Sequence, residues 1–311
     1  MSRIATALSR DAALRLGAAL GTFAYRVSAR YRRAAVENLT EVYGGAWSTE
    51  RIQAVARDVF RHLGMTTVEF VRLPSTSSAE LMKIVRVNGE ENLIEGLARG
   101  KGVLALTAHV GNFELMAAAC AARGYTISVI ARDADDARMN GVINGIRESK
   151  GYTVLSRKVA ARRSITALRR NELVGVLPDQ NDYSGIFVPF MGRLASSSPG
   201  PAFIALHSEA AVVPIFIRRD ADNNHTVDVY PALNVKRTGD RDLDIYELTY
   251  QMQGAIERAV RAHPDQWFWV HRRWKHQPTP AIETLWKETC DPMAAYRTGQ
   301  GLQPVKANKD G

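Results

Sequence analysis

The chain has 311 residues, a net charge of +9 and a sequence pI of about 9.7. This length suits one large α/β domain, and a hydrophobic fraction of 46% excludes a disordered chain. Two cysteines, Cys120 and Cys290, exclude a disulfide framework and favour a reducing, cytosol-facing location. The positive charge implies an acidic partner: a nucleic acid, an anionic membrane or a phosphorylated substrate.

The N-terminal region, residues 1–73, is predicted to be helical and to associate with a membrane. Residues 12–27 are mostly apolar, but Arg15 and Arg26 enclose only ten uncharged residues, whereas a spanning helix needs about 20. We therefore expect an amphipathic helix on the membrane surface, with its arginines facing anionic head groups. The side chains expected to enter the interface are Leu14, Leu16, Leu20, Phe23 and Tyr25. The alternative is a helix packed against the domain itself.

A further helix is predicted to begin at Ser48 or Thr49 and to reach Val71, before a break at 73–78. From residue 81 strands alternate with helices, which predicts an α/β fold with a mostly parallel central sheet flanked by helices. The expected strands are 84–87, 103–108, 125–130, 152–155, 173–177, 212–217 and 226–230, and the expected helices are 90–99, 114–123, 136–150, 159–170, 199–210 and 243–262. The predicted organisation is thus 1–73, an α/β domain at 74–285 and a tail at 286–311.

The strand at 103–108 runs directly into His109, and Val-Gly-Asn then leads into a helix that Asn112 can cap. His109 is therefore expected at the carboxyl end of a strand, where open α/β sheets bind ligands. Glu114 is expected in the first turn of the helix, close enough to accept a hydrogen bond from one imidazole nitrogen and leave the other free as a base. The alternative is a histidine satisfied by a loop carbonyl.

Two other strands are followed by side chains that suit a site. Arg132 comes after 125–130 and Asp179 after 173–177, so both are expected at the same edge of the sheet as His109. For Arg132, and for Arg147 one helix later, the alternative is a solvated arginine. No Gly-x-Ser-x-Gly elbow, cysteine nucleophile or zinc-ligand spacing is recognisable, which favours a histidine base acting on a substrate hydroxyl.

Two apolar or aromatic stretches leave alternatives open. Residues 185–192 are predicted to be an apolar loop that lines a channel or belongs to the core. Residues 266–275, Gln-Trp-Phe-Trp-Val-His-Arg-Arg-Trp-Lys, interleave aromatic and basic side chains. Such a pattern suits stacking on nucleic-acid bases, a membrane interface or a phosphorylated glycolipid.

Several short motifs follow one another along most of the chain. They are Asn38-Leu39, His109-Val-Gly-Asn-Phe-Glu114, Pro178-Asp179-Gln180, Phe187-Val-Pro-Phe190, Gly200-Pro201-Ala202, Val213-Pro214 and 267–275. The second resembles the His-x4-acid motif of the glycerolipid acyltransferase superfamily, and together they resemble the late (lauroyl/myristoyl) acyltransferases of lipid A biosynthesis. The chain departs from the family in its N-terminal hydrophobic segment, which is weaker than in many members. This difference bears on whether the chain spans the membrane and not on the chemistry.

The resemblance implies a peripheral or singly anchored enzyme at the cytoplasmic face of the cell inner membrane. It would move an acyl chain from acyl carrier protein or coenzyme A to a hydroxyl of a phosphorylated glycolipid, a lipid A precursor. The resemblance implies that His109 is the base and Glu114 its partner, with no metal and no cofactor besides the acyl thioester. The residues that we assign to substrate binding are Arg132, Asp179, Arg147 and Arg272.

In the expected reaction His109 takes the proton of a hydroxyl, the alkoxide attacks the thioester, and backbone amides at 111–113 stabilise the oxyanion. The same chemistry on a lysophospholipid or a phosphatidylinositol mannoside is an alternative. A basic nucleic-acid-binding protein is a second alternative, but no Lys/Arg-rich arm supports it, so nucleic acid is not an expected partner. For the floor of the acyl-chain pocket, Phe187, Phe190 and Met191 are the residues to test.

Overall fold

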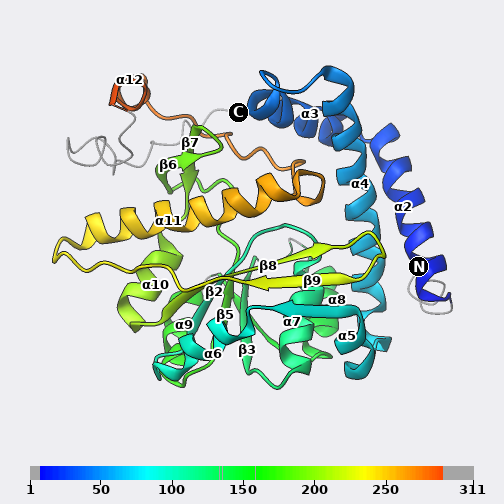
Figure 1. Cartoon of the computed structure of the whole chain (residues 1–311), viewed down its shortest axis with the longest axis horizontal. Coiled ribbons are helices and arrows are strands. Elements are labelled where there is room, and N and C mark those ends of the chain that lie inside the picture. The colour runs from blue at the N-terminus through cyan, green and yellow to red at the C-terminus, as the bar shows by residue number, and fades with distance from the viewer. Residues whose placement is uncertain (1–7, 133, 135, 158, 290–311) are drawn as a thin grey trace.

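The computed structural model describes residues 8–132, 134, 136–157 and 159–289. The strands of its main sheet are β1 (Val85–Asn88), β2 (Val103–Leu106), β3 (Ile127–Ala131), β4 (Thr153–Ser156), β5 (Leu173–Val176), β8 (Ala211–Arg219) and β9 (His225–Val229). Their order is β1-β9-β8-β2-β5-β3-β4 (Figure 1). All strands from β8 to β4 are parallel, whereas β9 is antiparallel to β8. The prediction of a mostly parallel α/β sheet is confirmed.

Helices cover both faces of the sheet because its strands are apolar on both sides. In β2, Leu104 and Leu106 point into one core, and Val103 and Ala105 point into the other. The first core is closed by α4 (Thr49–Arg72), α9 (Ala160–Arg169), α10 (Gly200–Ser208) and α11 (Arg241–Ala262). The second is closed by α5 (Ser78–Ile84), α6 (Glu90–Ala98) and α7 (Phe113–Ala122). Helix α8 (Ala137–Glu148) lies beside β4 and buries none of its residues.

The N-terminal helices are part of the folded body. Helix α2 (Arg10–Val27) packs along α4, and a Cβ at Gly21 would lie 2.1 Å from the Phe60 carbonyl oxygen, so the close crossing requires glycine. Helix α3 (Ala29–Tyr43) places Leu39 in the same core as β2. Residues 8–73 therefore share a core with the sheet. None of the described helices is both long enough and apolar enough to cross a membrane.

Packing of α2 on α4 covers part of the apolar face that was expected on the first helix and leaves the rest exposed. Leu14 is buried and Tyr25 packs edge-on against Phe60, with ring centroids 5.4 Å apart. Leu20 and Phe23 remain exposed, together with Val27, which the sequence reasoning did not include. Membrane contact by Leu14 was a wrong expectation because this side chain is buried, whereas Leu16 and Tyr25 are half-buried.

The stretch 185–192 is not a loop. It forms β6 (Ile186–Phe190) of a hairpin with β7 (Arg193–Ser197), and β6 packs on α11. The turn uses Met191 and Gly192, which both have positive φ, at 56° and 76°. The side chains proposed as the acyl-pocket floor, Phe187, Phe190 and Met191, are buried in core clusters away from the main cavity.

Both boundaries expected from the sequence fall inside helices. The boundary at 73/74 falls within the 3-10 helix η1 (Leu73–Ser75), and α12 (Pro280–Thr289) crosses the boundary at 285/286. The body therefore continues past residue 285. The rest of the expected tail, 290–311, with Cys290, lies outside the described residues.

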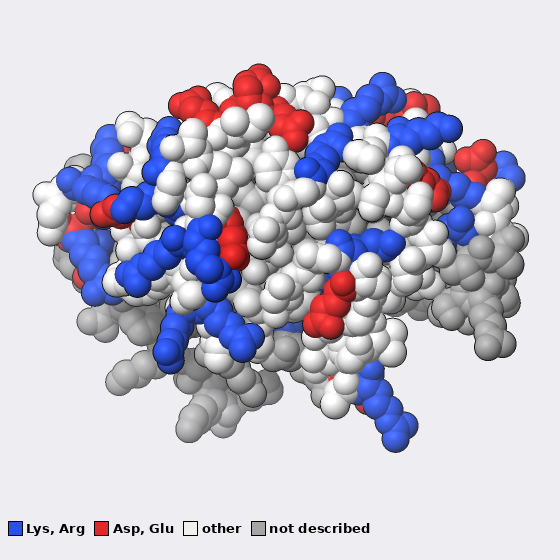
Figure 2. Space-filling view, turned by 90° about the horizontal axis from the view of Figure 1, so that it is seen from below, with Lys and Arg blue, Asp and Glu red and all other residues white. Residues whose placement is uncertain are grey.

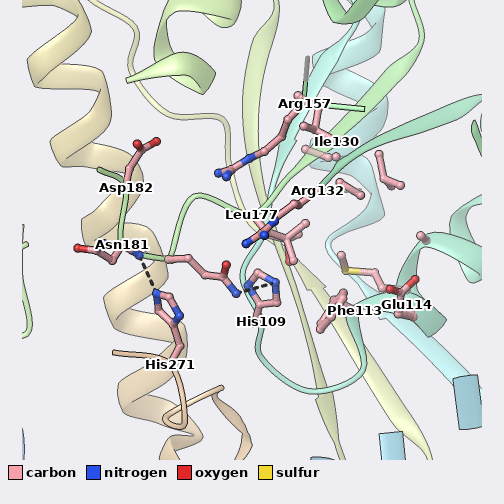
Figure 3. A pocket seen from close by; sticks show the side chains of 18 of the residues that line it. His109, Phe113, Glu114, Ile130, Arg132, Arg157, Leu177, Asn181, Asp182 and His271 are labelled. Atoms are coloured by element: carbon pink, nitrogen blue, oxygen red, sulfur yellow. Dashed lines mark hydrogen bonds between the residues drawn. The ribbon is translucent and has the colours of Figure 1, made fainter. Parts of the chain in front are cut away.

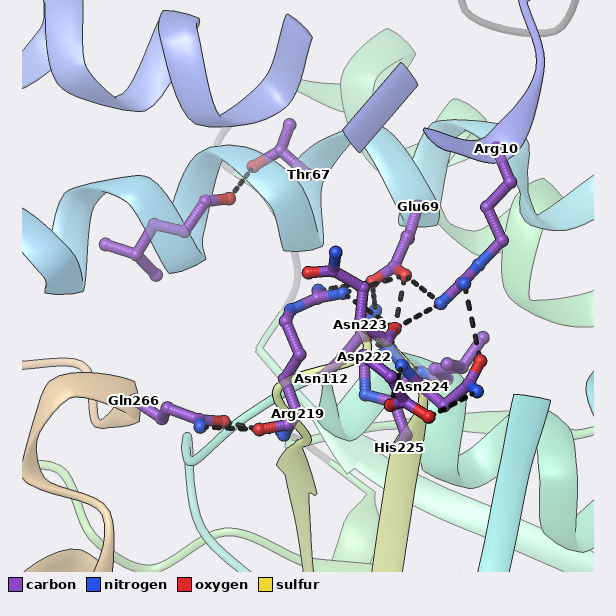
Figure 4. A network of polar contacts seen from close by, with 12 residues as sticks. Arg10, Thr67, Glu69, Asn112, Arg219, Asp222, Asn223, Asn224, His225 and Gln266 are labelled. Atoms are coloured by element: carbon purple, nitrogen blue, oxygen red, sulfur yellow. Dashed lines mark hydrogen bonds and ion pairs between the residues drawn. The ribbon is translucent and has the colours of Figure 1, made fainter. Parts of the chain in front are cut away.

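A buried polar network joins α4 to the edge of the sheet (Figure 4). Glu69 accepts hydrogen bonds from Asn112 Nδ2 at 2.8 Å and from the Arg219 guanidinium at 3.1 and 2.5 Å, and it pairs with His225 Nε2 at 3.2 Å. Burial raises the pKa of Glu69, but the bonds to His225 and Arg219 outweigh this and hold the pKa well below its usual range. Asn112 also caps α7 by accepting from the Leu115 amide, so the network fixes the start of that helix.

Candidate active site

The central pair of the site is His109 and Asp179. Strands β2 and β5 are neighbours in register, with Leu106 opposite Val176, so the residues three positions beyond each strand also meet. His109 Nδ1 lies 2.8 Å from Asp179 Oδ1. The other ring nitrogen, Nε2, faces the side chain of Gln180, which lines the cavity; its amide nitrogen lies 3.4 Å from Nε2. The arrangement fixes one imidazole nitrogen and presents the other to a substrate.

Asp179 is held as a carboxylate although it is only 1% exposed. Its second oxygen, Oδ2, accepts from the His109 backbone N–H and from Trp267 Nε1, both at 2.8 Å. Burial raises the pKa of Asp179, but the His109 ring and these hydrogen bonds outweigh it and lower the pKa to about 2. Both oxygens of Asp179 thus have partners within the protein, and Asp179 does not line the cavity. This geometry does not favour the direct contact with substrate that the sequence had suggested.

The turn that carries His109 is tied to the C-terminal segment. Val110 and Trp267 form an isolated antiparallel bridge, and the Phe268 amide donates to the His109 carbonyl at 3.1 Å. Gly111 has a φ of 58°, and a Cβ there would lie 2.2 Å from the Ile217 carbonyl oxygen, so only glycine fits. The Gly111 amide donates to the Gln266 carbonyl at 2.9 Å. The Gly111 amide, one of those expected at 111–113 to stabilise an oxyanion, is therefore already engaged within the protein.

A cavity of about 830 Å³ opens beside His109 between α7 and the sheet. Its inner part is apolar and is lined from β2, β3, β5, β8 and α7. Ala105 and Gly175 are partners in the β2–β5 register and both line it, so two small residues leave the space. The volume and apolar lining are typical of a site that encloses an apolar ligand.

The mouth of the cavity is basic. Its exposed cations are Arg30, Arg132, Arg157, Arg272 and Lys275. Figure 3 shows Arg132 and Arg157 extending toward the same side of the cavity as Asn181 and Asp182, with His109 below them. On the face seen in Figure 2, Lys and Arg side chains gather in several groups around a broad area with few charged side chains. A mouth of this composition suits phosphate groups, which arginine binds through two hydrogen bonds.

Glu114 does not contact His109. Its carboxylate forms an ion pair with Arg147 Nε at 3.0 Å and accepts from the Tyr152 hydroxyl at 3.0 Å. The expected contact fails because Phe113, the first residue of α7, packs against the imidazole, with centroids 4.9 Å apart, while Glu114 points toward α8. Arg147 lines the cavity but is held by Glu114, and its guanidinium lies 6.0 Å from the Phe70 ring centroid.

Sequence reasoning missed some groups of the site. Arg157 directly follows β4, so the strand-end rule that identified Arg132 applies to it as well. Thr107 precedes His109 by two residues, is only 3% exposed and lines the cavity. Its buried hydroxyl has no hydrogen-bond partner among the residues that the structure describes. No simple pattern signals this hydroxyl, because its burial without a partner depends on the tertiary packing.

The aromatic stretch 266–275 is largely core. Trp267, Trp269 and Trp274 are buried, and Arg273 is buried with its guanidinium donating to the Ser196 carbonyl and the Ser197 hydroxyl, both at 2.6 Å. Buried indoles cannot stack on bases, so this basis for a nucleic-acid interface was wrong. Of the stretch, Val270, His271, Arg272 and Lys275 line the cavity.

His271 is held neutral. Burial, followed by the nearby Arg273, lowers the pKa of His271 to about 4. Its Nε2 therefore accepts from the Asn181 amide at 2.9 Å (Figure 3). Asn38 of α3 donates to the carbonyls of Trp269 and His271, both at 2.8 Å. The Asn38-Leu39 motif thus positions the C-terminal side of the site.

Comparisons with known proteins agree with one another. A family model described as bacterial lipid A biosynthesis acyltransferase matches residues 1–276. The chain is similar to the lipid A biosynthesis lauroyltransferase of Escherichia coli (strain K12), with 28% identity over 269 residues and 85% of each chain covered. It is 26% identical over 271 residues to the palmitoleoyltransferase of that strain, again with 85% of each covered. A phosphatidylinositol mannoside acyltransferase of Mycobacterium tuberculosis (strain ATCC 25618 / H37Rv) is 24% identical over 213 residues, or 66% of each chain.

The low pKa of Asp179, about 2, makes its contribution to stability pH-dependent. A depressed folded-state pKa stabilises the protein above the unfolded value, and the contribution is lost as the pH falls toward the folded value. We expect the difference in free energy of unfolding between wild type and Asp179→Asn to shrink by about 1 kcal/mol from pH 5 to pH 3. Urea titrations measure it, with the exposed Glu95→Gln as the control. A difference that stays constant over this range contradicts the prediction.

Proposed function

Because the chain belongs to the bacterial lipid A biosynthesis acyltransferase family, we propose that it moves a fatty acyl chain from an acyl thioester to a hydroxyl of a lipid A precursor. The chain is an acyltransferase of the lipid A biosynthesis type, as its motifs predicted. The observation that carries the finer proposal is the His109–Asp179 pair at the mouth of a cavity that is apolar inside and basic outside. We propose the cytoplasmic face of the inner membrane as its location.

In the proposed reaction His109 Nε2 takes the proton of the acceptor hydroxyl while Asp179 holds the Nδ1–H. The alkoxide attacks the thioester carbonyl and forms a tetrahedral oxyanion. Collapse of this intermediate forms the ester and breaks the carbon–sulfur bond, and the thiolate takes the proton back from the imidazolium. One histidine thus accepts the proton of the acceptor hydroxyl and returns it to the leaving thiolate, and the acyl thioester is the co-substrate.

The cavity provides separate places for the apolar acyl chain and for the phosphate groups of the substrates. The apolar interior beside Ala105 and Gly175 suits the acyl chain of the donor. The mouth, with Arg132, Arg157 and Arg272, suits phosphate groups of a glycolipid acceptor or of the phosphopantetheine arm that acyl carrier protein and coenzyme A share. Since His109 lies between these regions, the thioester carbonyl and the acceptor hydroxyl meet at its Nε2.

Thr107 is the proposed donor to the oxyanion. Its hydroxyl is buried, lines the cavity and lies two residues before His109 on the same strand extension. A hydroxyl without a protein partner among the described residues is ready to donate to charge that develops in the transition state. In a site that excludes water, one such donor is worth about 10²- to 10³-fold in rate.

A row of exposed apolar side chains supports membrane docking beside the cavity mouth. Leu20, Phe23 and Val27 follow one face of α2, and Tyr31 continues the row in α3; their exposed fractions lie between 43% and 62%. Arg30 and Tyr31 also line the mouth. Apolar side chains flanked by arginines match an anionic bilayer surface, and the row would hold the mouth against the surface that carries the acceptor.

A related glycolipid acceptor is the second candidate. The similarity to a phosphatidylinositol mannoside acyltransferase favours it, because that protein is named for a phosphorylated glycolipid other than lipid A. The His109–Asp179 pair would act in the same way on either acceptor. Mass spectrometry of lipids from a deletion strain separates the two, because a different lipid loses one acyl chain in each case.

The function is tested with acyl-carrier-protein and acyl-coenzyme A donors and a tetra-acylated lipid A precursor. We expect His109→Ala to abolish transfer, and Asp179→Asn to lower kcat by about 10²- to 10⁴-fold because the imidazole loses its fixed tautomer. His207→Ala, an exposed histidine on α10, is the matched control and should keep the wild-type rate. Wild-type turnover in folded His109→Ala protein would reject the assignment.

The oxyanion role predicts that Thr107→Val lowers kcat by roughly 10²-fold with little change in KM, because the donor acts only in the transition state. Thr107→Ser retains the hydroxyl and should recover most of the rate. Steady-state kinetics with one donor at saturating acceptor measure both. Equal rates for the valine and serine variants would show that the hydroxyl takes no part.

The membrane role predicts weaker binding by the double variant Phe23→Ser/Val27→Ser. Loss of two exposed apolar side chains that would enter the bilayer should lower partitioning onto vesicles rich in phosphatidylglycerol by about 10-fold or more. Co-sedimentation measures it. Ile94→Ser, which removes an equally exposed apolar side chain from α6, is the control. If both proteins bind like wild type, another surface docks on the membrane.

A further inference from the structure

The large cavity has a small neighbour. A second cavity of about 20 Å³ lies between α6, α7 and the strands β8 and β9. Leu93, Val227 and Val229 contribute to its apolar wall. Met116, Cys120 and Ile215 line both cavities. These three side chains therefore form the partition between the space that opens at His109 and the second, smaller void.

The partition is built from two facing elements. Met116 and Cys120 are four residues apart on α7 and so lie on the same face of the helix. Ile215 faces them from β8, and α7 and β8 are in contact. Ile215 and Met116 are 1% and 7% exposed. Burial raises the pKa of the Cys120 thiol to about 11, so this side chain is neutral and packs as a small apolar group.

The route from the mouth to the partition follows small residues. From His109 inward, Thr107 and then Ala105 line the cavity from β2, and Gly175 lies beside Ala105 in the next strand. Side chains of this size leave a passage beneath α7. The passage meets larger side chains at Met116 and Ile215, which occupy the space between helix and sheet. These side chains bound the apolar space beneath α7 at this end.

We propose that Met116, Cys120 and Ile215 set the length of the acyl chain that the enzyme accepts, by closing the cavity where the methyl end of the chain arrives. The inference rests on the proposed function for the identity of the ligand and adds the residues that select it. The partition is thin, because a second void lies directly behind it. Small changes in these side chains therefore change the usable length of the cavity.

The test uses variants that open or thicken the partition. Ile215→Ala and Met116→Ala join the two cavities, so we expect both to prefer a longer donor than wild type. The ratio of kcat/KM for a donor two carbons longer to that for the wild-type optimum should rise by about 10-fold or more, since pockets discriminate single methylenes on this scale. Cys120→Leu should move the preference to shorter donors.

Matched controls separate chain-length selection from loosened packing. Val213→Ala removes a buried side chain from the same face of β8, and Leu115→Ala removes one from α7. Neither residue lines either cavity. Both controls should lose stability without a change in the preferred chain length. If Ile215→Ala or Met116→Ala does not fold, Ile215→Val gives the same comparison with a smaller opening.

Binding of free fatty acids of graded length to His109→Ala protein, followed by calorimetry, provides a readout that needs no transfer. A longer optimum in the Ile215→Ala background supports the partition even if wild type transfers no acyl chain, an outcome that rejects only the proposed function. Active wild type with the same chain-length profile in all partition variants overturns the inference and leaves the proposed function intact. A shift of equal size in the Val213→Ala control also overturns it.

Discussion

The buried carboxylate of Asp179 is the interaction on which the rest of the site depends. Its two oxygens bind the ring and the backbone of His109 and the indole of Trp267, and so join the ends of β2 and β5 to the C-terminal segment. An unpaired carboxylate at this depth would be strongly destabilising. The same contacts that keep Asp179 charged therefore hold the histidine ring in one orientation, and stability and chemistry share a single arrangement.

Around this pair the protein places two opposite environments within one cavity. Small side chains in β2 and β5 leave an apolar space under α7, whereas arginines from α3, from the ends of β3 and β4 and from the C-terminal segment gather at the mouth. A charge that develops beside an apolar space of this kind responds more strongly to nearby hydrogen-bond donors than it would in water. The buried Glu69 network supports the start of α7 and so the wall of this space.

Much of the fold could be predicted because local physics decides it. The short apolar runs became buried strands, and Ser48 and Asn112 cap α4 and α7 as expected. The hairpin at 186–197 was missed because its turn places Met191 at positive φ, which sequence patterns do not favour. The choice between a membrane and a packed helix as the partner of Leu14 and Tyr25 stayed open, because an amphipathic face looks the same whichever covers it.

The sequence by itself determined the strand-end positions of His109, Arg132 and Asp179, because each follows a short apolar run that is typical of a buried strand. Its motifs also determined the family. Only the tertiary structure decided that His109 pairs with Asp179 rather than with Glu114, since that choice depends on β2 and β5 being neighbours in register. Strand order is set by packing between segments far apart in the chain, and no local pattern encodes it.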